Sequence, residues 1–347
     1  MMTSRLILRC LSCFIAVLAV TFLHGQTSAF DEPAKAKTPA RRPQIEDFAP
    51  PEEFVMVGSI KTHFIRKGDT GTAVVLVHGF GASTITWQKT LDALAPRYQV
   101  YALDMKGFGL TAKPKDGNYH ATAYTDHLLG FLDAMKLEKV VLVGHSLGGA
   151  IAARLALLHP ERVRSLVLID PAPVALPKNN EAILRRAGVD VAKPGTAAEK
   201  AAKVNPVLAS RLLPALLRTT ITRQTVETGL KVAYHNPKFV TPEMVEIYYR
   251  PITIDGAAEA MASMMNPPPK AETPLPPITE LKTPALIVWG GHDQVVPFSL
   301  FENYVQSIPG AQKTVFANSG HVPHEEEADA FNARLLDFLD KLPGRVK

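Results

Sequence analysis

The fold of this chain is decided by the stretch Val140-Val141-Leu142-Val143-Gly144-His145-Ser146-Leu147-Gly148-Gly149-Ala150. A continuous apolar run, typical of a buried parallel strand, leads into a serine flanked by glycines, and a helix-forming segment from Ala150 to His159 follows. In this setting the pattern G-x-S-x-G predicts a sharp strand-to-helix turn that lifts the serine hydroxyl above the sheet. Small neighbours are needed because a Cβ atom at those positions would clash. Ser146 is therefore the candidate nucleophile.

Strands and helices alternate on both sides of this stretch. Buried parallel strands are predicted at Ala73 to Val77, Val100 to Leu103, Val140 to Val143 and Leu166 to Ile169, with helices at Thr86 to Ala95, Ala121 to Met135 and Ala150 to Leu158. Phe54 to Gly58 and Ile60 to Arg66 have alternating patterns that predict an antiparallel hairpin at the sheet edge. The chain is therefore expected to be an α/β protein with a mostly parallel, doubly wound sheet.

The alternation stops after Asp170 and resumes near residue 282. Between these points the pattern is helical and interrupted by prolines, with helices predicted at Glu181 to Ala187, Pro206 to Thr219 and Pro242 to Tyr249, before the Pro-rich Asn266 to Pro277. We predict a helical cap at 172–281, inserted into a core formed by 53–171 and 282–347. The core is completed by strands at Ala285 to Trp289 and Lys313 to Phe316 and by helices at Phe298 to Ser307 and about Glu325 to Lys341.

The N-terminal segment has the pattern of a signal peptide. Arg5 and Arg9 precede an apolar stretch from Cys10 to Leu23, and the small residues Thr27-Ser28-Ala29 suit cleavage, which predicts a signal peptide at 1–29 and export to the periplasm or beyond. The apolar stretch is shorter than the ~20 residues of a spanning helix. An uncleaved anchor is the alternative, and the only route to membrane contact that the sequence indicates. A linker rich in Pro, Ala and Lys is predicted at 30–52.

Composition narrows the function. Hydrophobic residues make up 46% and charged residues 20% of the chain, as in globular proteins with a large core. The net charge of +5 is spread along the sequence apart from a basic N-terminal tract, which argues against nucleic acid as a partner. The two cysteines, Cys10 and Cys13, both lie in the predicted signal segment, so the mature protein would contain no thiol and no disulfide.

A serine hydroxyl is a weak nucleophile and needs a general base, which a carboxylate usually orients. Asp293 follows the predicted strand Ala285 to Trp289, and His321 follows the next strand, so the chain order is Ser, Asp, His. These loops leave the carboxyl ends of parallel strands, where Ser146 would also lie. The oxyanion hole is assigned to the backbone N–H groups of Phe80, in the turn His78-Gly79-Phe80-Gly81, and Leu147, at a helix N-terminus.

With these motifs the chain resembles the α/β-hydrolase superfamily, in particular its cap-bearing members related to epoxide hydrolases, haloalkane dehalogenases, carbon–carbon bond hydrolases and carboxylesterases. The similar blocks, in order, are His78-Gly79-Phe80-Gly81 with Trp87, Leu103-Asp104-Met105-Lys106-Gly107-Phe108-Gly109, Gly144-His145-Ser146-Leu147-Gly148-Gly149, Gly291-His292-Asp293 and Gly320-His321-Val322-Pro323-His324-Glu325-Glu326. Dehalogenases and epoxide hydrolases of this group carry aspartate at the elbow, so Ser146 implies an acyl-enzyme route. Before Gly107 this chain has Met105-Lys106, whereas many relatives have an arginine directly before the glycine. This difference affects one local turn contact.

Several neighbouring residues have structural interpretations. Asp170 occupies a position where some hydrolases keep the catalytic acid, but beside Pro171 we interpret it as a cap or turn former and favour Asp293. His145 is assigned to packing, because it points to the other face of the strand end. His78 and Asp104 are expected to hold turns, and His292 to be exposed.

Three further residues could suggest other chemistry. His321 and His324 are three apart, but no cysteine or helix-face pair accompanies them, so a zinc site is not favoured and no metal is predicted. His324 is expected to open the last helix. Tyr248 and Tyr249 resemble the cap tyrosines that activate epoxides in relatives, but without an aspartate nucleophile they are interpreted as cap packing or pocket wall.

The sequence thus predicts an exported, cofactor-free serine hydrolase that acts on a small-molecule carboxylic ester with an apolar part. Leucines of the cap could bind that part or serve only cap packing: Leu208, Leu212, Leu213, Leu216 and Leu217. Carbon–carbon bond hydrolysis of vinylogous diketones is an alternative that would call for a polar pocket, often with arginine, and Arg185, Arg186 and Arg211 cannot be placed from sequence. Perhydrolysis and a catalytically silent binding protein are further alternatives, and the complete triad argues against the last.

Overall fold

The computed structural model describes residues 53–174, 206–265 and 272–342, and for residues 206–211 the backbone only. The predicted signal peptide and linker, and the helix predicted at Glu181 to Ala187, lie outside these ranges. Within the described ranges, no helix is both long and apolar enough to cross a membrane.

An eight-stranded sheet forms the centre of the described chain, in the order β1-β2-β4-β3-β5-β6-β7-β8. β1 pairs antiparallel with β2, β2 pairs antiparallel with β4, and the remaining neighbours are parallel. This confirms the predicted α/β class and the edge hairpin. The strands are β1 Glu53–Val57, β2 Ile60–Lys67, β3 Ala73–Val77, β4 Gln99–Leu103, β5 Val140–His145, β6 Val163–Ile169, β7 Ala285–Gly290 and β8 Gln312–Phe316.

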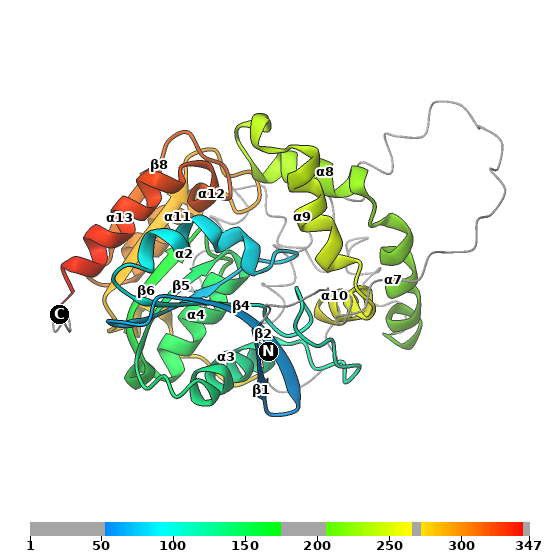
Figure 1. Ribbon diagram of the computed structural model, residues 1–347, viewed down its shortest axis with the longest axis horizontal. Helices are drawn as coiled ribbons and strands as arrows, with labels where there is room; N and C mark the ends of the chain where they lie inside the picture. The colour runs from blue at the N-terminus through cyan, green and yellow to red at the C-terminus, as the bar shows by residue number, and fades with distance from the viewer. Residues whose placement is uncertain (1–52, 175–205, 266–271, 343–347) are drawn as a thin grey trace.

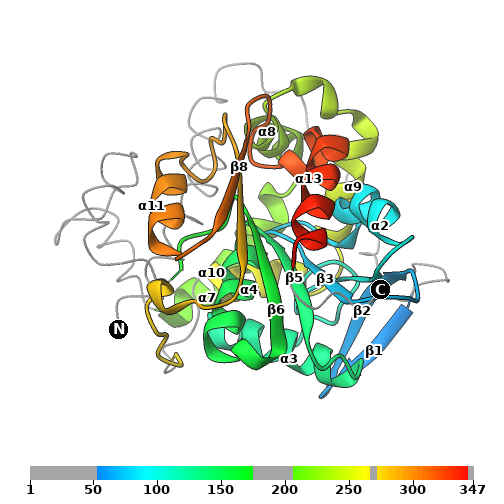
Figure 2. The same cartoon turned by 90° about the vertical axis from the view of Figure 1, so that its left-hand side faces the viewer.

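Helices cover both faces of the sheet (Figures 1 and 2). One face packs on α2 Gln88–Leu94 and α13 Ala328–Asp340, and the other on α3 Ala121–Ala134, α4 Leu147–Leu158 and α11 Ser299–Ser307. Alternate residues of each central strand enter the two cores; in β3, for example, Val75 and Val77 face α3 and α4, whereas Val74 and Leu76 face α2 and α13. Burial on both faces explains why the central strands are apolar throughout.

In the described part of the segment between β6 and β7, four α-helices form a group on one side of the core (Figure 1). We call them the insertion helices: α7 Pro206–Thr220, α8 Arg223–Ala233, α9 Pro242–Ile252 and α10 Ala257–Met265. α7 and α9 were predicted, with ends within three residues of those observed, whereas α8 and α10 were not. The predicted final helix is divided into α12 Pro323–Glu326 and α13.

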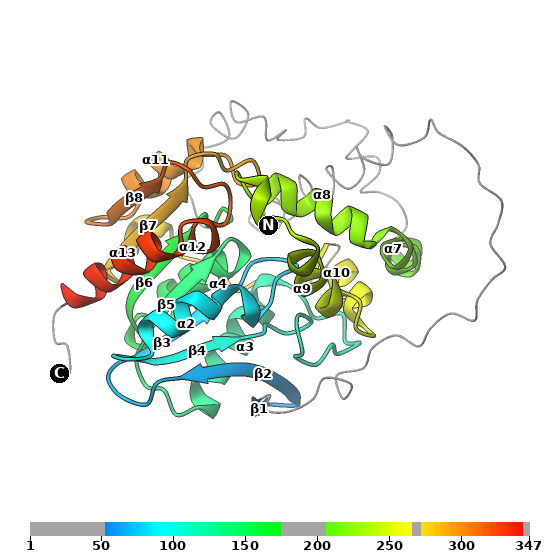
Figure 3. The same ribbon diagram turned by 45° about the horizontal axis from the view of Figure 1, so that its top comes forward.

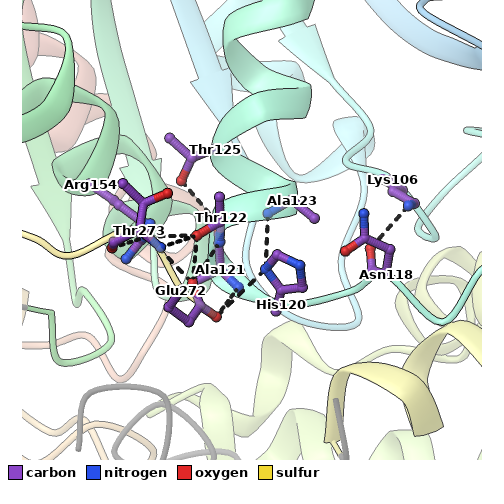
Figure 4. Close-up of polar contacts among 10 residues, drawn as sticks. All are labelled: Lys106, Asn118, His120, Ala121, Thr122, Ala123, Thr125, Arg154, Glu272 and Thr273. Atoms are coloured by element: carbon purple, nitrogen blue, oxygen red, sulfur yellow. Dashed lines mark hydrogen bonds and ion pairs between the residues drawn. The ribbon is translucent and has the colours of Figure 1, made fainter. Parts of the chain in front are cut away.

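The chain returns from the insertion to the core through a polar contact at the start of α3 (Figure 4). Glu272 accepts hydrogen bonds from the backbone N–H groups of Ala121 (3.1 Å) and Thr122 (3.0 Å) and from the Thr122 hydroxyl (2.7 Å). The buried Arg154 guanidinium lies 3.4 Å from the same carboxylate and donates to the carbonyl of Thr273 (2.8 Å). A carboxylate at a helix N-terminus satisfies unpaired N–H groups and interacts favourably with the helix dipole.

Candidate active site

Ser146 lies between the end of β5 and the start of α4, as the motif predicts. Its backbone has φ 52° and ψ −117°, a left-handed conformation that is strained for a residue with a side chain. The turn is held by hydrogen bonds from Ser146 N to the Ile169 carbonyl (2.9 Å) and from Ala172 N to the Ser146 carbonyl (3.0 Å). Ser146 is therefore fixed at the carboxyl end of the sheet.

The glycines of the motif permit this turn because the backbones around it approach closely. A Cβ atom on Gly144 would lie 2.5 Å from the Gly148 carbonyl oxygen, and one on Gly148 would lie 2.2 Å from the Val77 carbonyl oxygen. Real Cβ atoms do not approach backbone oxygens so closely, so larger residues would displace β3 or α4. The turn also lies between β3 and β5, where the direction of strand order reverses and α/β sheets form ligand crevices.

Asp293 and His321 come together in the loops after β7 and β8. His321 Nδ1 lies 2.8 Å from Asp293 Oδ2, and both side chains are buried. The other carboxylate oxygen, Asp293 Oδ1, accepts hydrogen bonds from the backbone N–H groups of Val295 (2.7 Å) and Val296 (2.9 Å). An ionised Asp293 is therefore well compensated, and it fixes the imidazole so that Nε2 is the nitrogen left for another partner.

His145 packs beside His321 and also contacts the backbone of the loop that carries it. Its Nε2 lies 2.7 Å from the His321 carbonyl oxygen, and its ring centroid lies 4.7 Å from those of both His321 and His324. Burial lowers the pKa of His145 well below its usual value, so the ring is neutral and donates from Nε2. The predicted packing role thus includes a hydrogen bond to the backbone of the candidate base.

A cavity joins these residues to the insertion helices. Ser146, His321, Phe80 and Leu147 all line it. Most of the remaining wall is apolar and comes from the insertion and from the loops after β6, β7 and β8: Ala172, Ile221, Val226, Leu230, Ala233, Tyr234, Tyr248, Ile252, Met261, Val295, Val296 and Val322. Among the described residues no arginine, lysine, aspartate or glutamate lines this cavity. A ligand beside Ser146 therefore meets an apolar surface.

The cap leucines that the structure describes do not line the cavity, so they do not form the surface considered for the apolar part of the ligand. Leu212 and Leu216 are exposed on α7, and Leu217 packs against Ala258 and Met261. Neither these three nor Leu213 lines the cavity, and the side chain of Leu208 lies outside the described residues. The apolar wall comes instead from α8, α9 and α10. Of these helices α8 contributes the most lining residues, and the sequence interpretation missed it although Thr222 and Thr225 form a capping box at its start.

Tyr248 lines the cavity, as predicted, and shares a buried partner with Tyr234. Both hydroxyls donate to the Glu325 carboxylate, at 2.8 Å from Tyr248 and 2.9 Å from Tyr234. Burial raises the pKa of Glu325 to about 7, although the two tyrosine hydrogen bonds oppose this shift. Glu325 belongs to α12, so these bonds tie α9 and the end of α8 to the core, and Figure 3 shows α8 extending toward α12.

Asp170 was interpreted as a cap or turn former, and this was incomplete. Its carboxylate is fully buried, and Oδ1 accepts a hydrogen bond from the backbone N–H of Gly290 (2.9 Å). One carboxylate oxygen of Asp170, one of Asp293 and one ring nitrogen of His321 lie within 4.8 Å of one another. The donor types could suit a metal ion, but His321 Nδ1 faces Asp293 at hydrogen-bond distance and Asp293 Oδ1 is taken by two N–H groups. We therefore interpret the cluster as acid and base groups.

His78, Asp104 and His292 lie as expected from the sequence, whereas His324 does not open the last helix, α13. His78 contacts the Gly79 carbonyl (2.7 Å) and accepts from Met105 N (3.1 Å), so it holds the turn after β3. Asp104 accepts hydrogen bonds from Thr84 N and Leu110 N and lies 2.7 Å from His63 Nδ1. His292 is exposed and stacks on His235. His324 lies within α12 and is buried against Trp87.

Comparisons with known proteins agree with this architecture. The family model for the alpha/beta hydrolase fold matches residues 72–328. The chain is 30% identical to a 2-hydroxy-6-oxo-2,4-heptadienoate hydrolase of Pseudomonas putida over 82% of this chain and 95% of that protein. Among solved structures, it is similar to a meta-cleavage product hydrolase from Pseudomonas fluorescens IP01, with a TM-score of 0.64 and 26% identity over 83% of this chain and 97% of the other.

A putative lipase from Acinetobacter baumannii AYE is also similar, with a TM-score of 0.65 and 23% identity over 84% of this chain and 91% of the other, which supports the fold. The family match covers Ser146, the insertion that follows it in the chain, and the loops that carry Asp293 and His321. This protein therefore belongs to the alpha/beta hydrolase fold family and is a hydrolase.

Proposed function

We propose that this hydrolase cleaves a carboxylic ester whose acyl or alcohol part is apolar, with Ser146 as the nucleophile. The observation that carries the proposal is the apolar cavity into which both Ser146 and His321 open. An apolar group gains about 25 cal/mol for each Å² that it removes from water. The wall therefore favours an alkyl or aryl group placed beside the nucleophile.

The proposed mechanism assigns one role to each polar group. Ser146 attacks the ester carbonyl, and His321 accepts its proton and passes it to the leaving alcohol. Asp293, 2.8 Å from His321 Nδ1, orients the ring and stabilises its charged form. Phe80 and Leu147 line the cavity, and their backbone N–H groups are proposed to bind the oxyanion, where one donor is worth ~3 kcal/mol. Water then hydrolyses the acyl-enzyme through the same His321.

A second candidate function is carbon–carbon bond hydrolysis. It is favoured by the names of two similar proteins: the 30% identical relative is a 2-hydroxy-6-oxo-2,4-heptadienoate hydrolase, and the similar solved structure is a meta-cleavage product hydrolase. The substrate in the relative's name carries a carboxylate, and binding it would call for a cation or several donors. The described lining of the cavity has two histidines and no arginine or lysine, which favours the ester. The side chains of Arg185, Arg186 and Arg211 lie outside the described residues.

One set of assays separates the two. p-Nitrophenyl esters from acetate to decanoate and a 2-hydroxy-6-oxo-2,4-dienoate are tested with the wild type and Ser146→Ala. The proposal expects ester turnover that is at least 100-fold more efficient, in kcat/KM, than cleavage of the dienoate, and loss of both in Ser146→Ala. Faster cleavage of the dienoate would favour the second candidate, and ester activity that survives in Ser146→Ala would contradict the mechanism.

A further inference from the structure

Asp170 is held between the carboxyl ends of β6 and β7 in a way that directs its carboxyl toward the catalytic loops. The residue has φ 43°, a left-handed conformation, and its backbone N–H donates to the Val288 carbonyl (3.0 Å). Its Oδ1 accepts from Gly290 N at 2.9 Å, at the end of the strand that leads to Asp293. A turn former would be solvated, whereas this side chain is completely buried.

The two carboxyl groups beside His321 have unequal surroundings. Asp293 is compensated by His321 and by two backbone N–H groups. Asp170 Oδ1 accepts from one N–H group, and within the described residues no N–H group donates to its Oδ2. Two carboxylates within 4.8 Å in a buried site repel, so the less compensated one keeps its proton. Burial, and then the charge of Asp293, raise the pKa of Asp170 well above its usual value, and Glu326 adds to this shift.

We propose that Asp170 and Asp293 share one negative charge and one proton beside His321, so that Asp170 is a positioning residue and a second acid of the site. The inference rests on the proposed function, in which His321 is the general base. In the resting enzyme Asp293 carries the charge and Asp170 the proton. When Asp293 is made neutral, the repulsion disappears, Asp170 releases its proton to water, and its carboxylate compensates the imidazolium that forms during catalysis.

A double-mutant cycle tests the sharing directly. The variants Asp170→Asn, Asp293→Asn and Asp170→Asn/Asp293→Asn keep the shapes of the side chains, and Asp255→Asn is the matched control because Asp255 is exposed. For p-nitrophenyl butyrate we expect kcat/KM to be three- to tenfold lower than wild type in Asp170→Asn, which loses the shared proton, and about 100-fold lower in Asp293→Asn. The double variant should be about 10⁴-fold lower, the loss typical of a triad without its acid. A double variant no slower than Asp293→Asn alone would overturn the proposal.

The pH profile separates charge sharing from a structural role. In Asp293→Asn the carboxylate of Asp170 still supports the protonated imidazole, so the acid limb of kcat/KM stays within half a pH unit of wild type. In the double variant no carboxylate of the pair remains, and the acid limb moves at least one pH unit lower. His321, Asp293, Glu326 and the neutral His145 are the titratable groups that face this region. An acid limb at the same pH in both variants would count against the sharing.

Thermal stability supplies a readout that does not need activity. The raised pKa of Asp170 means that wild type loses stability as pH rises above the unfolded value, and Asp170→Asn does not. The Tm advantage of Asp170→Asn should therefore grow from pH 5 to pH 8, and it should shrink when Asp293→Asn is also present. A Tm difference independent of pH would overturn the proposal, even if Ser146→Ala showed that the proposed function is wrong. Asp255→Asn should show no such pH-dependent gain.

Discussion

At the scale of single residues, the site depends on close approaches of backbone and side chains that only glycine permits. Gly79 shows this most clearly, because a Cβ atom there would lie 2.8 Å from His145 Nδ1 and 3.1 Å from Ser146 Cβ. His145 in turn bonds to the His321 carbonyl, so one added methyl group would disturb both the nucleophile and the base.

We therefore expect Gly79→Ala to lower kcat/KM for ester substrates 10-fold to 100-fold while the fold is retained, because misplacement of catalytic groups by a fraction of an ångström slows the chemical step. Steady-state kinetics and far-UV circular dichroism check this. Gly117→Asn is the control, since Gly117 has φ +64° and open surroundings, and asparagine tolerates that conformation. Equal activity of Gly79→Ala and Gly117→Asn would contradict the prediction.

Glu325 gives a pH-dependent prediction. Its pKa is about 7 in the folded protein and 4.5 for the free side chain, so its contribution to stability is fully present below pH 4.5 and is lost as pH rises through 7. Glu325→Gln removes the cost of the buried charge. At pH 8 we expect it to raise the free energy of unfolding by about 1 to 3 kcal/mol, a gain that disappears near pH 5.

Urea unfolding of wild type and Glu325→Gln at pH 5 and pH 8 measures this difference. Glu280→Gln, at an exposed acid, serves as the control and should behave alike at both pH values. If the effect of Glu325→Gln is the same at pH 5 and pH 8, the carboxyl group does not titrate as its burial implies.

At the scale of elements, α8 connects the cavity wall to the loop that carries His321. Val226, Leu230 and Ala233 line the cavity, and the Ala233 carbonyl accepts the backbone hydrogen bond of His321 (2.7 Å). Leu230→Ala should enlarge the cavity and shift the kcat/KM ratio of octanoate to butyrate ester upward by about 10-fold, because each buried methylene is worth ~0.8 kcal/mol. Leu335→Ala, in the core of the opposite face, should destabilise the fold without changing that ratio. A ratio unchanged in Leu230→Ala would exclude α8 from substrate binding.

The anchor of Glu272 at the start of α3 belongs to the same scale. Glu272→Ala leaves the buried Arg154 without its carboxylate and the first N–H groups of α3 without an acceptor. We expect a loss of about 2 to 4 kcal/mol in the free energy of unfolding, the usual cost of breaking a buried charge pair. Chemical denaturation measures it, with the exposed Glu280→Ala expected within 0.5 kcal/mol of wild type. A similar value for both variants would contradict the role of Glu272.

The sequence predicted the core well because its signals are local. Apolar runs such as Ala285 to Trp289 identify buried strands, and the glycine pattern around Ser146 identifies the elbow. The insertion was harder, since α8 is mostly polar and contains Gly229, and α10 is a helix of only nine residues, mostly alanine and methionine. The proximity of Asp170 to Asp293 could not be read from sequence, because the residues are far apart in the chain and meet only through the pairing of β6 with β7.

At the scale of the whole molecule, the core carries Ser146, Asp293 and His321, and the core and the insertion both contribute to the apolar wall of the cavity. The family match identifies the hydrolase fold, and the insertion residues that line the cavity are where we expect substrate selectivity to be set. A cap function for 172–281 and export through residues 1–29 stay predictions from the sequence.

The central claim is that Ser146 is a nucleophile activated by His321. Fluorophosphonate labelling of the full chain, followed by mass spectrometry of the labelled peptide, tests it most directly. We predict a single adduct on Ser146 in wild type and labelling at least 100-fold slower in His321→Ala, because the serine then lacks its base. Absence of labelling on the folded wild type, or an equal labelling rate in His321→Ala, would contradict the account.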